Sequence, residues 1–226
     1  MNNPSKRFKQ ALEQIDKSKS YSFSEAISLI KQLPKLKFDE SVDVALSLNI
    51  DPKKADQMVR GTVVLPSGTG KKVRVLVFCK GESEAQAKDA GADAVGANDL
   101  IDKVSKGFMD FDSVVATPDM MKDVSRLGKV LGPRGLMPSP KTGTVTNDVA
   151  KIIKELKAGK VEFRVNKQGG MLLSIGKLSF SVEALEKNFN VFFEAFNQAK
   201  PASVKGQFIK SMFISSTMGP GLRLKI

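Results

Sequence analysis

The clearest hydrophobic pattern in this chain is a strict alternation of apolar with polar or small residues over residues 42–50. A strand with this period buries one face and leaves the other wet, as in an antiparallel sheet covered on one side. The alternating apolar positions are Val42, Val44, Leu46, Leu48 and Ile50. A second strand is predicted over residues 61–65, and Pro66 ends it.

Helical spacing surrounds these strands at both ends of the chain. Ser22 and Glu25 have the spacing of a capping box, and the helix that they begin is expected to end before Pro34. A highly charged, partly helical stretch is expected over residues 6–19, and a longer helix over residues 181–200. We interpret the apolar stripe of this longer helix as core. It consists of Leu185, Phe189, Phe192, Phe193 and Phe196.

The middle of the chain has a different character. Residues 73–79 form a nearly continuous apolar run, which is typical of a strand buried on both faces. Helices and strands then alternate, which indicates a parallel α/β unit. The expected elements are helices over 82–90, over 99–105 and from Pro118 onward, and strands near Ala94–Val95 and over 113–116. A loop rich in Gly and Pro over 132–143 precedes a helix over 147–158.

Antiparallel patterns then return. Strands over 160–165 and 171–175 flank Asn166–Gly170, and we interpret them as a hairpin. A final strand pair is expected near 208–216 and 222–226.

These patterns predict an α/β protein of two domains, one inserted in the other. The first is a discontinuous α+β domain over residues 1–66 and 160–226, with an antiparallel sheet built from both chain ends. The second is a Rossmann-like α/β domain over residues 67–159. The two crossings between the domains are expected to form a hinge.

The charge of the chain indicates a polyanionic partner. The net charge is +12 and the isoelectric point is near 9.7. Residues 67–159 contribute only +3 of this charge, so most of it lies in the two end segments.

The composition argues against several classes of function. The chain has no histidine, so the commonest general base and zinc ligand is missing, and we expect no enzyme activity, cofactor or metal. The single cysteine, Cys79, lies in an apolar run and is interpreted as core in a reducing compartment. No apolar run approaches the roughly 20 residues of a membrane span, and no secretory signal is recognisable. We expect a cytoplasmic protein.

Two glycine-containing stretches invite a nucleotide-binding interpretation. Residues 67–72 do not have the phosphate-loop spacing, because Leu65 stands where the first glycine is needed, and they are better explained as a flexible linker. Residues 128–135 do not lie between a first strand and its helix, so they are no dinucleotide fingerprint. This loop region supplies candidate secondary RNA contacts at Lys129, Arg134 and Lys141, while an ordinary structured loop stays equally open. Asp110 and Asp112 are interpreted as structural.

The end segments combine residue types that suit folded RNA. Phe38 stands between charged residues just before the first strand, and a core role for it stays equally open. Arg164, Asn166 and Lys167 end another strand, and the turn over 216–219 lies in a tail with no acidic residue after position 194. Folded RNA is recognised by stacking, backbone contacts and bonds to sugar hydroxyls.

The chain closely resembles the bacterial form of the large ribosomal subunit protein L-one family along nearly its whole length. The stretches that carry the resemblance are Lys37–Glu40, Asp51–Lys54, Val59–Val63, Gly91–Asp93, Phe111–Asp112, Val114–Asp119, Lys129–Pro140, Gly143–Val145, Val161–Arg164 and Thr217–Pro220. The resemblance implies a protein that is a monomer when free and binds large-subunit ribosomal RNA in the mobile stalk. It also implies assistance to deacylated tRNA leaving the exit site, and repression of translation by binding the messenger RNA of the protein's own operon.

The resemblance also assigns an RNA-binding surface. Its residues are Lys37, Phe38, Ser41, Asp43, Arg164, Asn166, Lys167, Ser211, Thr217, Met218 and Gly219. Two of them depart from the family pattern, which often has Asp at the position of Asn166 and Glu at that of Asp43. The rival functions are a nucleotide-dependent enzyme that uses the Rossmann-like domain and a DNA-binding regulator.

Overall fold

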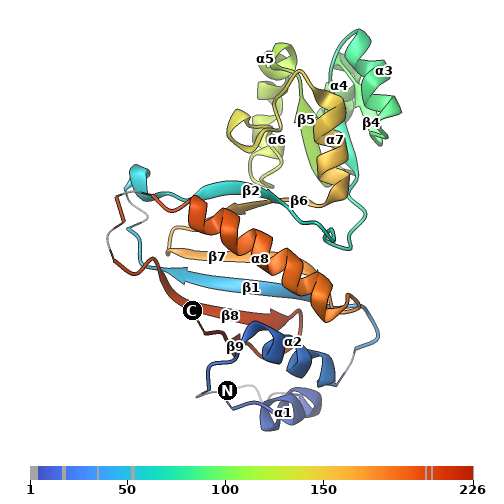
Figure 1. Cartoon of the computed structure of the whole chain (residues 1–226). Coiled ribbons are helices and arrows are strands. Elements are labelled where there is room, and N and C mark those ends of the chain that lie inside the picture. Colours follow the sequence, from blue (N-terminus) through green and yellow to red (C-terminus); the bar gives the residue numbers. More distant parts are fainter. Residues whose placement is uncertain are drawn as a thin grey trace. The chain divides into compact units, whose positions relative to one another are not determined.

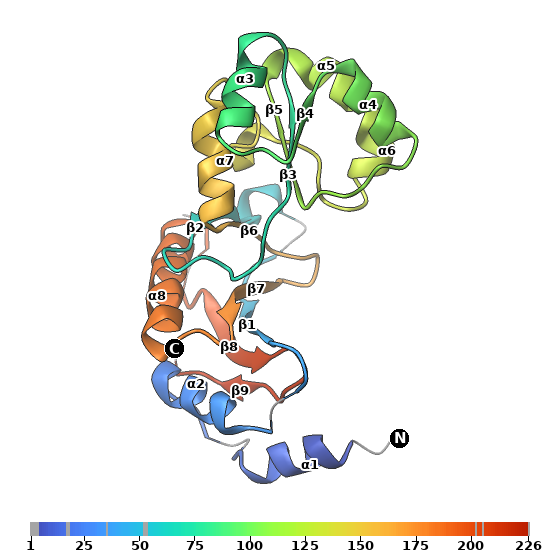
Figure 2. The same cartoon turned by 90° about the vertical axis from the view of Figure 1, so that its right-hand side faces the viewer.

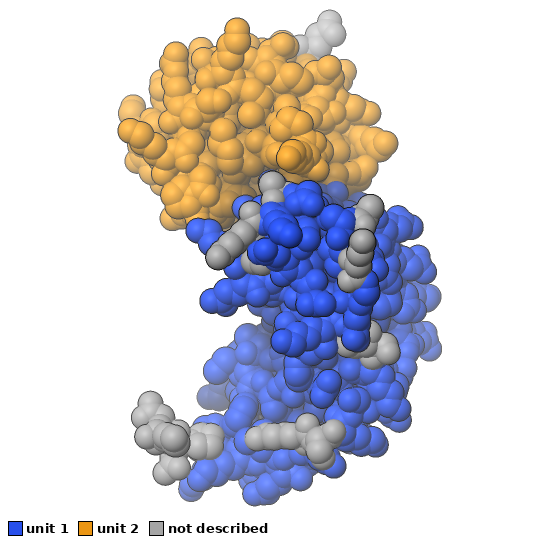
Figure 3. Space-filling view, turned by 90° about the vertical axis from the view of Figure 1, so that its left-hand side faces the viewer, with its two compact units in different colours: residues 1–70, 162–226 blue, residues 71–161 orange. Residues whose placement is uncertain are grey.

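The structure is a computed structural model that describes residues 5–16, 19–34, 36–51, 54–201, 203–204 and 206–225. It is a mixed α/β fold with helices and several sheets. The chain forms two compact units, which Figure 3 draws in separate colours. Unit 1 consists of Met1–Gly70 with Glu162–Ile226, and unit 2 is Lys71–Val161. These bounds lie four and two residues beyond the crossings expected at 66/67 and 159/160.

Unit 1 is built on a four-stranded sheet. Its strand order is β7 (Gly170–Lys177), β1 (Ser41–Leu48), β8 (Ile209–Ser216) and β9 (Leu222–Arg223). β1 is antiparallel to both β7 and β8, so a strand from the amino-terminal segment lies between two strands from the carboxyl-terminal segment (Figure 1). The two chain ends therefore share one sheet.

One face of this sheet is covered and the other is open. Burial alternates strictly along β1, with Val42, Val44, Leu46 and Leu48 pointing into the core. α8 (Val182–Gln198) and α2 (Phe23–Gln32) pack over that side, and Figure 2 shows α8 along one face of the strands. Phe192 and Phe196 of α8 are fully buried. The core interpretation of the stripe is confirmed for Leu185, Phe189, Phe192 and Phe196, whereas Phe193 is only half-buried and stacks on Phe189.

The capping box is confirmed at the start of α2. The Ser22 side chain accepts a hydrogen bond from the Glu25 amide, and the Glu25 carboxylate accepts one from the Ser22 amide. These bonds lower the pKa of Glu25 from its ordinary value. The charged opening stretch forms a shorter helix than expected, α1 (Lys6–Glu13), with Ser5 as its N-cap.

The expected hairpin after residue 160 is wrong. β6 (Lys160–Arg164) pairs with β2 (Arg60–Val64) in a separate two-stranded sheet, and β7 pairs with β1. The turn itself closes, because the Asn166 amide donates to the Gly170 carbonyl at 2.8 Å. β6 diverges because Phe163 packs edge-on against Phe192 and Phe196. Gly61 makes this possible, since a Cβ there would lie 2.5 Å from the Phe163 ring.

Unit 2 is a three-stranded parallel sheet. The order is β4 (Ala94–Gly96), β3 (Val75–Phe78) and β5 (Ser113–Ala116). All four residues of β3 are buried, because one apolar cluster lies on each side of it. The helices of this unit include α3 (Glu82–Asp89), α4 (Asn98–Ser105) and α7 (Val149–Ala158). Cys79 follows β3 fully buried, and burial raises the pKa of its thiol.

The helix expected from Pro118 is a series of short pieces instead. They are η2 (Pro118–Met120), α5 (Met121–Val124), η3 (Ser125–Leu127) and α6 (Gly128–Leu131). The Ser125 hydroxyl donates to the Met121 carbonyl, a bond that competes with regular helix geometry. The loop over 132–143 contains one turn of 3-10 helix, η4 (Pro140–Thr142).

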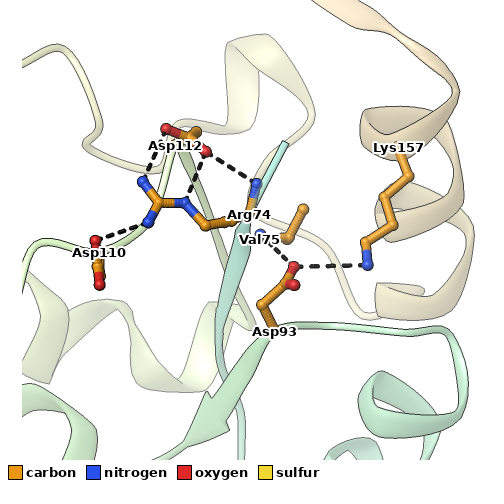
Figure 4. Close-up of polar contacts among 6 residues, drawn as sticks. All are labelled: Arg74, Val75, Asp93, Asp110, Asp112 and Lys157. Atoms are coloured by element: carbon orange, nitrogen blue, oxygen red, sulfur yellow. Dashed lines mark hydrogen bonds and ion pairs between the residues drawn. The ribbon is translucent and has the colours of Figure 1, made fainter. Parts of the chain in front are cut away.

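An ionic network holds the entry to β3 (Figure 4). Arg74 pairs with Asp112 at 3.2 Å and with Asp110 at 2.7 Å, and the Asp112 carboxylate also accepts the Arg74 amide. Asp93 accepts the Val75 amide and lies 3.5 Å from the Lys157 ammonium group. Arg74 lowers the pKa of the Asp112 carboxyl. The structural interpretation of Asp110 and Asp112 is confirmed.

The first two residues of the predicted flexible linker, Ser67 and Gly68, are fixed by hydrogen bonds to Asn188. Asn188 on α8 is fully buried and accepts the Ser67 amide at 2.9 Å. Its amide nitrogen donates to the carbonyls of Gly68 and Ile175 at 3.0 and 2.8 Å. The chain leaves unit 1 from this fixed point. No helix in the described part of the chain is long and apolar enough to cross a membrane.

Candidate nucleic-acid interface

The turn after β8 extends the pairing between β1 and β8. The Thr217 amide donates to the Ser41 carbonyl at 3.0 Å, and the Ser41 amide donates to the Thr217 hydroxyl at 2.9 Å. The Thr217 hydroxyl can also donate to the Ser41 carbonyl, with 3.4 Å between the two oxygens, near the limit of a hydrogen bond. Thr217 is exposed, so its hydroxyl can keep its acceptor role inside the protein and donate outward.

Two charged side chains hold the backbone of Met218. Its amide donates to Glu40 Oε2 at 3.0 Å, and its carbonyl accepts Arg7 Nη2 at 2.7 Å. The Met218 side chain is 55% exposed. Sequence reasoning missed both Glu40 and Arg7. The signal for Glu40 was present, because this acidic residue closes the Lys37–Glu40 motif, whereas no local pattern marks Arg7.

Gly219 is needed for a close approach inside the turn. Its amide donates to the Ser216 carbonyl at 3.1 Å, and a Cβ at this position would lie 2.4 Å from the Ser216 hydroxyl oxygen. Ser216 is buried, so little space exists for a side chain at residue 219.

The segment before β1 displays an aromatic ring. Phe38 is 53% exposed, which excludes the alternative that it is a core residue. Lys37 is exposed beside it. The Lys177 ammonium group donates to the Asp39 carbonyl and to the Ser41 hydroxyl, each at 3.1 Å. The end of β7 therefore holds this segment next to the Thr217 turn.

Asp43 lies on the uncovered face of the sheet. It pairs with Ser174 on β7 and with Ser215 on β8, so the three side chains form a row across three strands. The Ser174 hydroxyl is buried without a hydrogen-bond partner. Ser47 pairs with Ser211 on β8 and with Gly170 on β7, so two further hydroxyl-bearing residues are neighbours across these strands.

The other predicted residues lie where β6 ends and β7 begins. The Asn166 side-chain oxygen accepts the amides of Gln168 and Gly170 at 2.9 and 2.8 Å. An aspartate could accept the same two amides, so the turn does not depend on which of the two residues is present. Asn166 differs in that its NH₂ group adds a donor where Asp would add a negative charge.

A hollow adjoins this turn. Arg164, Asn166 and Lys167 line it together with Ile50 and Met58, and its volume is about 540 Å³. The three polar residues are exposed, as is the Met58 side chain, at 45%.

The structure thus sorts the predicted residues of unit 1 into two clusters. We name the first the Thr217 cluster; it consists of Lys37, Phe38, Ser41, Asp43, Thr217, Met218 and Gly219. We name the second the Arg164 cluster; it consists of Arg164, Asn166, Lys167 and Ser211. Pairing of Ser47 with both Ser211 and Gly170 brings the second cluster to one end of β1, while Ser41 and Thr217 mark the other end. At about 3.3 Å per residue, Ser211 and Thr217 are roughly 20 Å apart along the strand.

The secondary candidates belong to unit 2. Lys129 lies on α6, Arg134 in the following loop and Lys141 in η4, and all three are exposed. They do not share an element with either cluster of unit 1.

This surface lacks the features of a catalytic centre in the residues that the structure describes. No group of three potential metal ligands comes together among them. The exposed groups are instead hydroxyls, an amide, cations, an aromatic ring and a thioether, on an open sheet with cations at both ends. The fold is mixed α/β, and the exposed groups of this surface are of the kinds that contact folded RNA.

The chain belongs to the Ribosomal protein L1p/L10e family, whose model matches residues 29–220. It is 57% identical over 218 residues to the large ribosomal subunit protein uL1 of Bifidobacterium animalis subsp. lactis (strain AD011), covering 96% of this chain and 95% of that protein. It is 53% identical over 226 residues to the protein of the same name from Protochlamydia amoebophila (strain UWE25), covering 100% and 96%. Members of this family are structural constituents of the large ribosomal subunit and are not enzymes.

Proposed function

We propose that unit 1 binds a folded region of large-subunit ribosomal RNA through the Thr217 cluster and the Arg164 cluster together. The observation that carries this proposal is their placement toward the two ends of β1, where Ser211 and Thr217 are about 20 Å apart along the chain. An A-form helix or a compact RNA loop is wide enough to contact both. Because the protein is part of the large ribosomal subunit, we place it in the cytoplasm.

The two clusters divide the chemistry of binding. Thr217, Ser41 and the backbone of Met218–Gly219 offer hydrogen bonds to sugar hydroxyls and phosphate oxygens, and Phe38 offers a ring for stacking. Lys37, Arg164 and Lys167 supply the salt-dependent attraction to phosphates. Unit 2 adds weaker phosphate contacts through Lys129, Arg134 and Lys141.

The wider role that we propose is that of the mobile stalk beside the tRNA exit site. There the protein, a monomer when free, helps deacylated tRNA to leave. It also represses translation by binding a site on the messenger RNA of its own operon. Support comes from the family to which the chain belongs and from the large-subunit protein names of its relatives. In this proposal the two units are an RNA-binding domain and an inserted Rossmann-like domain joined by a hinge.

Competition gel shifts test the proposal. The full chain is incubated with a labelled transcript of the stalk region of large-subunit ribosomal RNA, at a stated salt concentration. Unlabelled ribosomal transcript and operon leader are expected to compete, and duplex DNA is expected to fail at 100-fold excess. Equal competition by duplex DNA would support a DNA-binding regulator instead. A nucleotide titration that gave saturable binding would favour the nucleotide-dependent enzyme.

A further inference from the structure

The main chain on both sides of the Met218 Cα is held by charged groups from two other chain segments. Glu40 accepts the Met218 amide and Arg7 donates to the Met218 carbonyl. Hydrogen bonds in which one partner is ionised are shorter and stronger than neutral ones. The 2.7 Å bond from Arg7 is of this kind. The amide belongs to the peptide that precedes Met218 and the carbonyl to the peptide that follows it, so neither peptide plane can rotate about the Met218 Cα without breaking a charged bond.

We propose that Arg7 is a positioning residue for RNA binding. Acting from α1, it fixes the peptide between Met218 and Gly219, while Glu40 fixes the peptide before it, so that the Met218 side chain and the Gly219 backbone keep the orientation in which they meet RNA. This inference rests on the proposed function, because Arg7 acts through a turn assigned to the RNA surface. It makes α1 part of the binding machinery, although α1 contributes no residue to either cluster.

The bonds of Arg7 favour positioning over direct phosphate contact. Its guanidinium group donates to two main-chain carbonyls, those of Met218 at 2.7 Å and Pro34 at 3.4 Å. Pro34 follows the end of α2, so Arg7 ties together α1, the exit from α2 and the RNA turn. These bonds use one donor on each terminal nitrogen and direct that side of the guanidinium group toward the protein main chain.

The docking of α1 depends on contacts of modest extent. Ala11 is its buried residue, and Phe8 and Leu12 line a hollow of about 340 Å³ together with Phe213 of β8. A helix of eight residues is unstable alone in water. α1 is therefore stable only when docked, and the Arg7 bond to the turn belongs to that docked state. RNA affinity should accordingly follow the docking of α1.

The first test compares two charge-neutralising changes on the same helix. Arg7→Gln removes the clamp, and Lys9→Gln removes an equal charge at an exposed position two residues away. Dissociation constants for the ribosomal transcript are measured across a salt series. We expect Arg7→Gln to weaken binding about tenfold, with the slope of log Kd against log salt unchanged. Lys9→Gln should change Kd by no more than about twofold.

Two results would overturn the inference. A salt slope that fell by about 0.7–0.9 in Arg7→Gln would mean that Arg7 itself neutralises a phosphate. An unchanged Kd would mean that the turn does not need the clamp. If the unaltered chain failed to bind the transcript at all, the proposed function would fall as well, so the two failures are distinguishable.

A double-mutant cycle with Met218→Ala tests whether Arg7 acts through Met218. If it does, Arg7→Gln should weaken binding less in the Met218→Ala background than in the unaltered chain, because the Met218 side chain is already gone while the residue 218 carbonyl and the Gly219 backbone remain. Fully additive losses would contradict the inference. In the free protein, the ¹³C-methyl resonance of Met218 should shift in Arg7→Gln and stay in place in Lys9→Gln, a readout that does not depend on RNA.

Discussion

At the scale of single residues, the turn after β8 joins structure and recognition in the same atoms. The Thr217 hydroxyl completes the pairing with Ser41, and the Met218 backbone is engaged at both polar groups. A substitution here therefore changes the shape of the turn together with its chemistry. Matched variants are needed to separate the two effects.

Gly219 offers such a match, because Gly221 lies in the same turn. A Cβ at residue 219 would meet the Ser216 hydroxyl at 2.4 Å, whereas a Cβ at residue 221 would have no neighbour within 4 Å. We expect Gly219→Ala to cost about 1 kcal/mol in RNA binding by displacing the turn, and Gly221→Ala to be neutral. Adding Ser216→Ala to Gly219→Ala should restore part of the loss. Binding assays at fixed salt measure all three variants, and equal losses in the two single glycine variants would refute the steric argument.

Thr217→Val should weaken both folding and binding. The Ser41 amide loses its acceptor, and the RNA loses a hydroxyl, so we expect losses of about 1 kcal/mol in unfolding free energy and 1–3 kcal/mol in binding. Thr217→Ser keeps the hydroxyl and serves as the control. Urea unfolding and filter binding measure the two quantities. Binding of Thr217→Val within a few tenths of a kcal/mol of the unaltered chain would remove Thr217 from the interface.

At the scale of elements, the entry to β3 shows how charged groups stabilise a strand end. Arg74 bonds to Asp110 and Asp112 on the segment that leads into β5, so the two neighbouring parallel strands are tied together where they begin. The carboxylates are partly exposed, which limits the strength of each pair. Their effect is best measured through pH.

The lowered pKa of Asp112 predicts an acid-sensitive contribution to stability. Because the folded-state pKa lies below the ordinary value of 3.8, the contribution is fully present above that value and is lost as pH falls through the folded-state pKa. We expect Asp112→Asn to have a lower melting temperature than the unaltered chain at pH 6. Below about pH 3 the difference between the two melting temperatures should become smaller. Scanning calorimetry at both pH values measures this. A difference that stayed constant with pH would contradict the linkage.

Periodic elements could be predicted from the sequence, but their partners could not. The alternation in β1 and the aromatic stripe of α8 are local consequences of burial, so each is visible within one segment. The pairing of β6 with β2 depends on Phe163 packing above Gly61, about a hundred residues apart along the chain. A turn that looks like a hairpin turn contains no information about such a contact.

For the same reason, only part of the candidate site could be predicted from the sequence. Arg164 ends a strand in a polar segment, where exposure is expected, whereas for Phe38 a core role was equally open and only the structure shows the ring exposed. Arg7 lies 211 positions from Met218, and nothing near either residue marks their contact. The division into two clusters likewise needed the pairing register of β1 with β7 and β8.

At the scale of the whole molecule, both clusters are built from residues of unit 1. The two segments of unit 1 are separated along the sequence by the whole of unit 2. The sheet needs both segments, because β1 comes from the first and lies between β7 and β8 from the second. Asn188 fixes the point where the first segment ends. The strand pairings of this sheet therefore lie within unit 1.

We therefore expect that residues 1–70, joined to residues 162–226 by a short Gly–Ser linker, fold and keep specific binding to the ribosomal transcript. If Lys129, Arg134 and Lys141 each contact a phosphate in the full chain, the joined variant should lose up to about three such contacts, and its salt slope should fall by roughly two to three. Substituting all three residues with Gln in the full chain should reproduce the same slope, which makes it the matched control. Circular dichroism establishes folding, and filter binding across a salt series measures the dissociation constant and the salt slope of both variants. Tight, specific binding by residues 71–161 alone would reverse this assignment, because the RNA would then recognise the unit that contains neither cluster.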